Sequence, residues 1–241
     1  MDDGRLPEPA AIAEEALGLL SVTGDLTGVK VLVTAGPTRE PLDPVRYLTN
    51  RSSGKMGYAV AREAEKRGAQ VTLVSGPTVL EPVRGVALIP VVTAAQMEAV
   101  VREHFPHCDI LVMAAAVADY RLASVLPEKR KKTAGGWALA LEPTADILSG
   151  LKSLRRPGQF ICGFAAETEE VKANARRKLA EKGLDLIAAN DVSREGTGFD
   201  SDRNALTLLW PDGSEDRVPE ASKAQCAQAL WDAISEARRG A

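Results

Sequence analysis

The sequence predicts an α/β protein with a Rossmann-like three-layer fold, in which a mostly parallel central sheet is covered by helices and carries long active-site loops. One observation is a series of uninterrupted apolar runs, such as residues 29–36, which are typical of strands buried on both faces of a sheet. Another is that segments with apolar residues at helical spacing lie between these runs. The third is that polar loops follow several strand ends, where open parallel sheets bind their ligands.

The first half of the chain supplies four expected strands and two expected helices. The strands are residues 29–36, 70–76, 86–91 and 108–118. The helix over 56–68 shows apolar residues at helical spacing and closes at Gly68, a residue type that commonly ends helices. The helix over 93–105 begins after Thr93, which we expect to serve as its N-cap.

The alternation is interrupted by the polar and basic residues 119–136 and then resumes. Strands are expected at 137–143, 159–167, 184–191 and 204–214, and helices at 144–154, at 168–182 and from Ser222 onward. Thr168, followed by two acidic residues, is typical of a helix start. Ser222 with Gln225 three residues later has the spacing of a capping box.

The composition narrows the classes of function. The chain has 241 residues, of which 45% are hydrophobic and 26% charged, and its net charge is −3, so nothing electrostatic favours nucleic-acid binding. No apolar run approaches the ~20 residues that span a membrane. The three cysteines, Cys108, Cys162 and Cys226, are widely spaced without a C-x-x-C pattern, which indicates a reduced, cytoplasmic compartment.

The long loop that follows the first strand is the most informative segment. Residues 31–57 read VLVTAGPTREPLDPVRYLTNRSSGKMG, without the G-x-G-x-x-G turn of dinucleotide-binding folds. The loop carries several Arg, Ser and Asn side chains and ends where a helix begins. A helix start backed by cations is an anion site. With two further polar loops, 119–136 and 191–203, it predicts one site assembled at the same edge of the sheet.

Several other residues have both a structural and a functional interpretation. The basic run 127–132 is either a solvated loop or a set of phosphate-binding cations. Asp119 is either a turn residue or a carboxylate for a ribose, a base or a divalent ion. Phe164 suits the core or a site where a base approaches, and Lys178 and Lys182 share one helix face. The Walker A, G-x-S-x-G and H-E-x-x-H patterns are missing, so no specific reaction is predicted. The residues alone predict an α/β enzyme that handles a phosphorylated ligand at a site made of several loops.

A family resemblance adds the chemistry. From about residue 29 to 238 the chain resembles the phosphopantothenoylcysteine synthetase family, and the strings that carry the resemblance are TAGPTREPLDPVRYLTNRSSGKMG, SGP, AAAVADYR, PEKRKK, GFAAET, LDLIAANDVS and GTGFDSDRNALTLLW. The resemblance implies a homodimer that ligates 4′-phosphopantothenate to L-cysteine. It implies that CTP first converts the carboxylate into an acyl-cytidylate with release of pyrophosphate, and that cysteine then displaces CMP. It also implies Mg²⁺ with CTP, held by ligands that the sequence does not identify.

The resemblance also implies roles for particular residues. Asn50 is expected to hold the acyl-cytidylate, Arg46 to serve the step with cysteine, and Lys129 to neutralise phosphate charge. The residues implied to bind CTP are Met113, Ala114, Ala115, Asp119, Lys129, Ala145, Asp146, Ile147, Leu148, Phe164, Lys178 and Lys182. Ser52, Ser53, Gly54 and Lys55 are weaker candidates for binding phosphopantothenate. The chain reads Thr-Ala-Asp-Ile where the family often has Asn-Pro-Asp-Ile.

The ends of the chain and two rival functions complete the expectations. Residues 1–27 resemble a linker and short helix left from a flavin-dependent decarboxylase domain, to which bacterial members are fused, and residues 28–241 are expected to form the synthetase domain without a flavin. One rival is an NAD(P)-dependent oxidoreductase on a Rossmann-like fold, although G-x-G-x-x-G and Tyr-x-x-x-Lys are both missing. The other is a non-catalytic, nucleotide-binding regulator.

Overall fold

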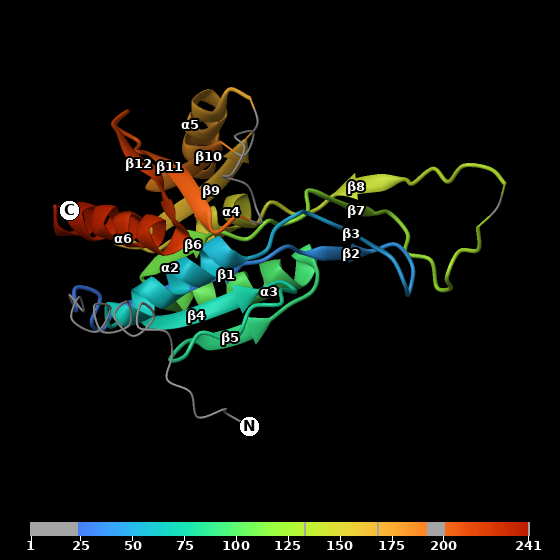
Figure 1. Ribbon diagram of the computed structural model, residues 1–241, viewed down its shortest axis with the longest axis horizontal. Coiled ribbons are helices and arrows are strands. Elements are labelled where there is room, and N and C mark those ends of the chain that lie inside the picture. The colour runs from blue at the N-terminus through green and yellow to red at the C-terminus, as the bar shows by residue number, and fades with distance from the viewer. Residues whose placement is uncertain (1–23, 133, 168, 192–200, 241) are drawn as a thin grey trace.

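A computed structural model describes residues 24–132, 134–167, 169–191 and 201–240 of the chain. Its centre is an eight-stranded sheet with the order β12-β11-β10-β9-β6-β1-β4-β5 (Figure 1). The strands are β1 Lys30–Ala35, β4 Gln70–Ser75, β5 Ala87–Pro90, β6 Ile110–Met113, β9 Phe160–Glu167, β10 Leu186–Asp191, β11 Arg203–Leu209 and β12 Glu215–Ser222. Neighbouring strands are parallel from β5 to β10 and antiparallel from β10 to β12, which confirms the mostly parallel sheet.

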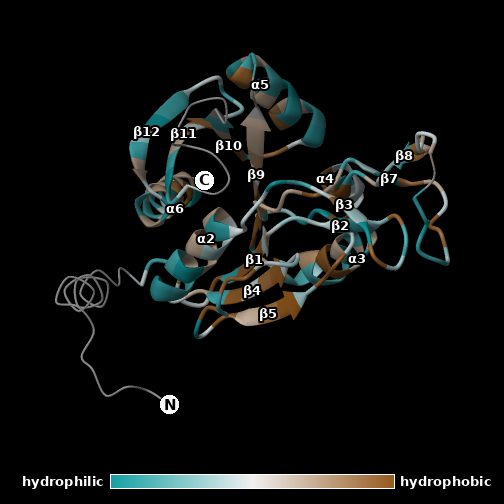
Figure 2. Ribbon diagram, turned by 45° about the vertical axis from the view of Figure 1, so that its right-hand side comes forward, coloured by the Kyte–Doolittle hydropathy of each residue, from teal (hydrophilic) through white to brown (hydrophobic). Residues whose placement is uncertain are grey.

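Helices cover both faces of this sheet and create a three-layer architecture. The helices are α2 Lys55–Lys66, α3 Ala94–His104, α4 Ile147–Leu151, α5 Val171–Lys182 and α6 Lys223–Arg239, with short 3₁₀ turns at Phe105–His107 and Lys152–Leu154. Side chains alternate along β1, so Val31 and Val33 join the core under α2 and α6, whereas Leu32 joins the core under α3, α4 and α5. Figure 2 shows the apolar strands between the more hydrophilic helices.

Helix starts follow the sequence signals in most cases. Thr93 and Ser222 each form the expected capping box, at α3 and α6 respectively. The helix expected at 144–154 begins later than expected, because the side chain of Asp146 accepts a hydrogen bond from the Ser149 amide and caps α4. Thr168 lies outside the described residues, and α5 begins at Val171.

A second structural unit lies outside the central sheet. It contains the antiparallel pairs β2 (Arg39–Pro41) with β3 (Tyr47–Thr49) and β7 (Tyr120–Leu122) with β8 (Leu141–Pro143). We call residues 39–49, 120–132 and 134–143 the arm, because Figure 1 shows them extending away from the body of the molecule. The long loop 37–57 and the polar stretch 119–136 therefore contain strands that the sequence did not reveal.

The arm corrects two sequence-based expectations. The strand expected at 137–143 is reduced to β8, and it pairs with β7 instead of joining the central sheet. The strand expected at 108–118 ends at Met113, because the amide of Ala115 binds a side chain instead of the backbone of the neighbouring strand. The amide of Ala115 donates to Thr34 Oγ1 at 3.1 Å, and the amide of Ala116 donates to the Gly36 carbonyl at 2.9 Å.

Residues 24–27 are attached to the body. Leu26 is buried, its amide donates to the Arg67 carbonyl at 3.1 Å, and Asp25 pairs with the Arg67 guanidinium at 3.4 Å. Arg67 is itself buried and also pairs with Glu63 and Asp232, which ties the end of α2 to α6. Residues 1–23, where the linker and short helix are expected, lie outside the described residues, so the division at residue 27 stays a prediction.

The cysteines and the helices bear on two sequence-based expectations, a reduced compartment and the lack of a membrane span. All three cysteines are buried as free thiols. Burial raises the pKa of Cys108 to about 12 and also raises the pKa of Cys162 and of Cys226, so these thiols suit packing better than nucleophilic chemistry. Within the described parts of the chain, every helix is too short or too polar to cross a membrane.

Candidate active site

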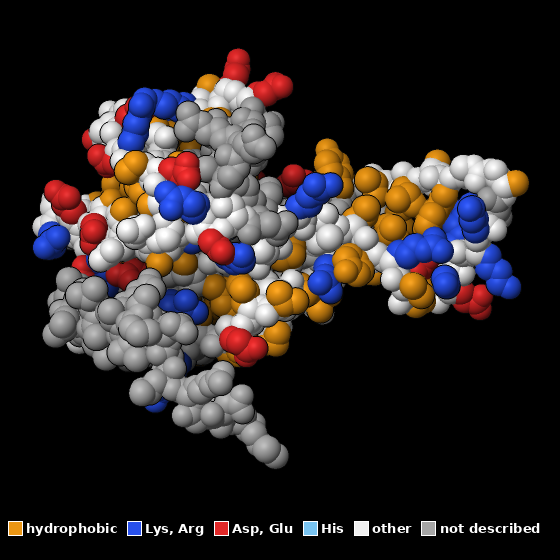
Figure 3. Space-filling view, in the orientation of Figure 1, with side chains coloured by type: hydrophobic (Ala, Val, Ile, Leu, Met, Phe, Trp, Pro, Cys, Tyr) orange, Lys and Arg blue, Asp and Glu red, His pale blue; other side chains and the backbone are white. Residues whose placement is uncertain are grey.

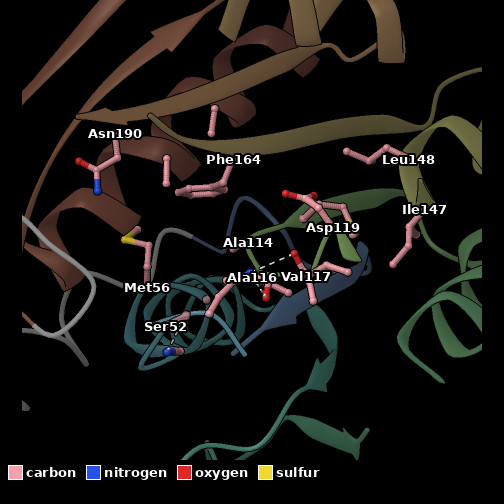
Figure 4. Close-up of a pocket in the computed structure, with 18 of the residues that line it drawn as sticks. Ser52, Met56, Ala114, Ala116, Val117, Asp119, Ile147, Leu148, Phe164 and Asn190 are labelled. Carbon is pink, nitrogen blue, oxygen red and sulfur yellow. Dashed lines mark hydrogen bonds between the residues drawn. The ribbon is translucent and has the colours of Figure 1, made fainter. Parts of the chain in front are cut away.

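The main cavity lies at the edge of the sheet where the strand order reverses, between β1 and β6. This is the position at which doubly wound sheets bind ligands. The cavity has a volume of about 660 Å³. Of the residues expected in the site, the cavity is lined by Asn50, Ser52, Ser53, Gly54, Lys55, Met113, Ala114, Ala115, Asp119, Ala145, Asp146, Ile147, Leu148, Phe164, Lys178 and Lys182. Figure 4 shows how several of them surround the cavity from different elements.

The floor of the cavity is the loop 114–118, whose backbone is hydrogen-bonded by the side chains of Thr34, Thr38, Asn50 and Thr144. Thr34 and Thr38, both fully buried, accept hydrogen bonds from the amides of Ala115 at 3.1 Å and Ala118 at 2.9 Å. Asn50 Nδ2 donates to the carbonyls of Ala116 and Val117, each at 3.1 Å, as the dashed lines in Figure 4 show. The small residues of this loop leave its backbone open to a ligand, and Asn50 fixes the position of that backbone.

The start of α2 closes one side of the cavity and is built for close approach. Gly54 has φ +80°, and a Cβ at this position would lie 2.7 Å from Thr78 Cγ2 and 3.3 Å from Gly36 Cα. No side chain caps α2, in contrast to α3 and α6. Because the first amides of a helix lack partners inside the helix, this start presents hydrogen-bond donors and a partial positive charge to an anion.

The opposite side carries an ion pair. Lys182 lies 3.4 Å from Asp146, and both line the cavity together with Lys178. Burial raises the pKa of Asp146, but hydrogen bonds from Ser149 and the charge of Lys182 lower the pKa by more. The Asp146 carboxyl therefore has a pKa below its usual value and is ionised at neutral pH.

Two expected residues, Arg46 and Lys129, do not line the cavity and lie in the arm. Arg46 donates to the Arg130 carbonyl at 2.8 Å, and both guanidinium groups stack on Trp137, at 5.5 and 4.9 Å from the ring centre. Asp43 is buried beneath them and accepts hydrogen bonds from the amides of Val45, Arg46 and Arg130. The basic run is thus attached to the 42–46 turn, and Figure 3 shows its cations at the tip of the arm.

The cavity also contains residues that the sequence did not single out. They include Met56, Thr144, Asn190, Asn204 and Lys223. Asn190 lies near the end of β10, a signal that the strand-end argument could have used. Asn204 and Lys223 reach the cavity because β11 and β12 run antiparallel and return the chain to this edge, which no local pattern announces.

Comparison with known proteins identifies the family. Residues 26–237 match the family described as DNA/pantothenate metabolism flavoprotein C-terminal domain, and the chain belongs to this family. It is 47% identical over 234 residues to the coenzyme A biosynthesis bifunctional protein CoaBC of Escherichia coli K12, a match that covers 96% of this chain and 57% of the relative. The corresponding protein of Bacillus subtilis is 45% identical over 223 residues, covering 91% of this chain and 55% of that protein.

Solved structures agree with this assignment. The crystal structure of the C-terminal domain of CoaBC has a TM-score of 0.77 and 38% identity, covering 91% of this chain and 100% of that domain. A Cab2 mutant in complex with phosphopantothenate-cysteine has a TM-score of 0.70 at 18% identity, covers 97% of this chain and 96% of Cab2, and shows the likeness of fold alone. The chain spans a little over half the length of the curated relatives, and these matches do not favour the oxidoreductase alternative.

Proposed function

We propose that this chain is the ligase unit of a bifunctional coenzyme A biosynthesis protein and joins 4′-phosphopantothenate to L-cysteine with CTP. The observation that carries the proposal is the cavity at the strand-order reversal, whose walls are made of the strings that resemble the synthetase family. The relatives are named bifunctional and are longer than this chain, which supports a fused flavin-dependent decarboxylase domain in the natural protein. The buried free cysteines support a cytoplasmic location.

The proposed reaction has two steps. In the first, a carboxylate oxygen of 4′-phosphopantothenate attacks the α-phosphorus of CTP, the bond to pyrophosphate breaks, and an acyl-cytidylate forms. In the second, the amino group of cysteine attacks the acyl carbon, loses a proton, and CMP leaves. Lys178 and Lys182 offset phosphate charge from α5, and the backbone of 113–115 orients the nucleotide. Asn50 keeps the loop beneath the reacting phosphate in place, so catalysis rests on positioning and charge stabilisation.

A divalent cation such as Mg²⁺ fits this cavity when the protein and the substrate phosphates each supply some of its ligands. Among the described residues, no cluster of three or more His, Cys, Asp or Glu side chains could hold a metal ion by itself. Asp146 is engaged by Lys182 and Ser149, whereas Asp119 offers an exposed carboxylate at the cavity wall. Asp119 and phosphate oxygens suit Mg²⁺, which commonly binds one carboxylate together with substrate phosphates. The ion would supply further neutralisation of triphosphate charge.

We propose further that the protein is a homodimer in which a second copy covers the arm. Large apolar side chains with exposed fractions of 46 to 58% gather there, and Figure 3 shows them along the arm. They are Val45, Tyr47, Tyr120, Val125 and Leu141. A contiguous exposed apolar patch of this kind marks an interaction surface.

Placing a charge in this patch is expected to split the homodimer. In Tyr120→Asp, a desolvated carboxylate would oppose association, so the mass measured by analytical ultracentrifugation should fall from two chains to one. Val79→Asp is the matched control, because Val79 is fully exposed but lies outside the arm. A dimer that withstands Tyr120→Asp and Val125→Asp together would contradict this interface.

The nucleotide requirement tests the ligase itself. Pyrophosphate release is expected only when CTP and 4′-phosphopantothenate are both present, because the acid is the nucleophile. CTP should support release more than about tenfold faster than ATP or GTP, a difference of about 1.4 kcal/mol or more in transition-state binding. The nucleotide-binding regulator predicts no release, and the oxidoreductase predicts hydride transfer from NAD(P)H instead. Equal rates with CTP and ATP would contradict the nucleotide assignment.

A further inference from the structure

One end of the cavity carries two lysines, Lys55 and Lys223. Figure 4 shows Met56 and Asn190 on one side, Ile147 and Leu148 on the other, and Phe164 between them. Asp146 precedes Ile147, and Lys182 lies 3.4 Å from Asp146, so these two residues belong to the side of Ile147. Lys55 and Lys223 belong to the side of Met56.

The placement of these two lysines follows from their elements. Lys55 precedes Met56 and is the first residue of α2. Asn204 Nδ2 lies 3.8 Å from Met56 Sδ, and the pairing of β11 with β12 sets Asn204 opposite Ala221, just before Lys223 begins α6. Two helices that pack on each other thus begin at the same end of the cavity, and each begins with a lysine that lines it.

The burial of the two lysines differs from that of the acid beside them. Lys223 is only 8% exposed and the Lys55 side chain 33%, whereas the Asp202 side chain is 86% exposed. Lys55 Nζ lies 2.6 Å from Asp202 Oδ1, and the Lys223 amide donates to the Asp202 carbonyl at 2.9 Å. A hydrogen bond from Lys55 lowers the pKa of Asp202, and the charge of Lys223 lowers this pKa further. Both lysines therefore act on one carboxylate.

This arrangement suits an exchange of anions. A buried charge is costly without negative charge nearby, and Lys223 is buried, so this end of the cavity favours an anion whether or not a substrate is bound. Asp202 provides that charge, but its side chain projects into solvent and can move at little cost. A phosphate group offers more charge and more acceptor oxygens than one carboxylate, and lysine is a common phosphate ligand.

We propose that Lys223 and Lys55 form a subsite for a phosphate group of a bound substrate, and that this phosphate replaces the Asp202 carboxylate. The inference rests on the proposed function, since that reaction brings two phosphate-bearing molecules to the cavity. The phosphate could be the monoester of 4′-phosphopantothenate or the terminal phosphates of CTP. Both sources share one chemistry, a phosphate dianion, and the experiment separates them.

Lys223→Met is expected to raise the dissociation constant of a phosphate-bearing ligand by about 10- to 100-fold, the usual effect of losing one charge-assisted hydrogen bond. Binding is measured by isothermal titration calorimetry with one ligand at a time, in the absence of cysteine and of turnover. The four ligands are 4′-phosphopantothenate, pantothenate, CTP and CMP. Lys30→Met is the matched control, because Lys30 is an exposed lysine at the start of β1, at the opposite edge of the sheet.

The ratio of the affinities of two ligands, one with and one without the phosphate in question, identifies which phosphate the subsite binds. If Lys223→Met removes the preference for 4′-phosphopantothenate over pantothenate, the subsite takes the monoester. If it removes the preference for CTP over CMP, the subsite takes the triphosphate end. Unchanged ratios in a variant with wild-type circular dichroism and melting would overturn the subsite. Should Lys223→Met not fold, Lys55→Met is judged by the same two ratios, because Lys55 is more exposed.

Asp202→Asn tests the exchange. Removing a competing carboxylate is expected to tighten binding of the same phosphate-bearing ligand by a few-fold and to leave the ligand without phosphate unaffected. Weaker binding would show that Asp202 supports the ligand and does not compete with it, and would overturn the exchange. A chain that shows the predicted phosphate preferences but never releases pyrophosphate would contradict the proposed ligase and leave the subsite standing.

Discussion

Lys129→Gln is expected to slow pyrophosphate release by about 10²- to 10³-fold, the usual effect of losing one preorganised charge contact to a transition state. Negative charge grows on the departing pyrophosphate, and a lysine ammonium can follow it as a mobile point charge. Lys129 is exposed and makes no hydrogen bond or ion pair with the described residues, whereas neighbouring Arg130 is held by Asp43, Arg46 and Trp137. Of the two neighbours, Lys129 is therefore the one whose charged group is not held by contacts within the arm.

The measurement is a pyrophosphate-release assay with saturating CTP and 4′-phosphopantothenate. Lys131→Gln is the matched control, because it removes the same charge two residues away in the same exposed run. Near wild-type release in Lys129→Gln together with a large loss in Lys131→Gln would contradict the prediction, because the role would then belong to Lys131.

The location of Lys129 outside the cavity makes a second comparison informative. Either the basic run moves toward the cavity of its own chain, or it serves the cavity of a second copy. Mixing Lys129→Gln with Asn50→Asp separates the two, because only a shared site lets two inactive chains restore pyrophosphate release in a mixed dimer. Unchanged inactivity of the mixture would place Lys129 on its own chain's cavity.

The middle of the central sheet could be predicted because strands such as β1, β4 and β6 are buried on both faces. The runs around Val33, Leu73 and Val112 contain hardly any polar residue, and burial of that kind leaves a local pattern. The starts of α3 and α6 were predictable for a similar reason, since a capping box is complete within four residues.

The strands that were missed are exposed or very short. β12 reads EDRVPEAS, is mostly exposed, and is specified by its pairing with β11, because its own composition does not favour a strand. The strands of the arm have three residues each, too few to show a period of two. The run after Met113 has the composition of a strand, but the hydroxyls of Thr34 and Thr38 bind its amides, and such distant contacts leave no mark in the run itself.

The site was predictable where each residue belongs to a loop that follows a strand, as Asn50 and Asp119 do. Lys223 was not, because it begins the last helix and reaches the cavity only through the antiparallel return of β12. Arg46 and Lys129 show the converse limit. Sequence places them in loops that leave the active edge, yet the tertiary contacts around Asp43 and Trp137 hold that part of the loops in the arm.

Asn50→Asp is expected to reduce the amount of acyl-cytidylate by about 10²- to 10³-fold. The Asn50 amide group donates to two carbonyls of the loop under the reacting phosphate, at 3.1 Å each. A carboxylate cannot donate these bonds, repels both carbonyl oxygens, and adds negative charge beside phosphate. Because Thr34 and Thr38 still hold the loop, the fold should persist while the position of Ala116 and Val117 changes.

Arg46→Gln is the informative comparison, because the proposed role of Arg46 is to bind the carboxylate of incoming cysteine, which a guanidinium suits, and not to act in the first step. We expect this variant to form the acyl-cytidylate and to pass it poorly to cysteine, so the intermediate should accumulate. Mass spectrometry of quenched reactions, with and without cysteine, measures the intermediate in both variants. Asn174→Asp controls for the added charge, because Asn174 lies on α5 outside the cavity lining. Normal turnover in Arg46→Gln, or wild-type amounts of intermediate in Asn50→Asp, would show that these two residues do not divide the half-reactions in this way.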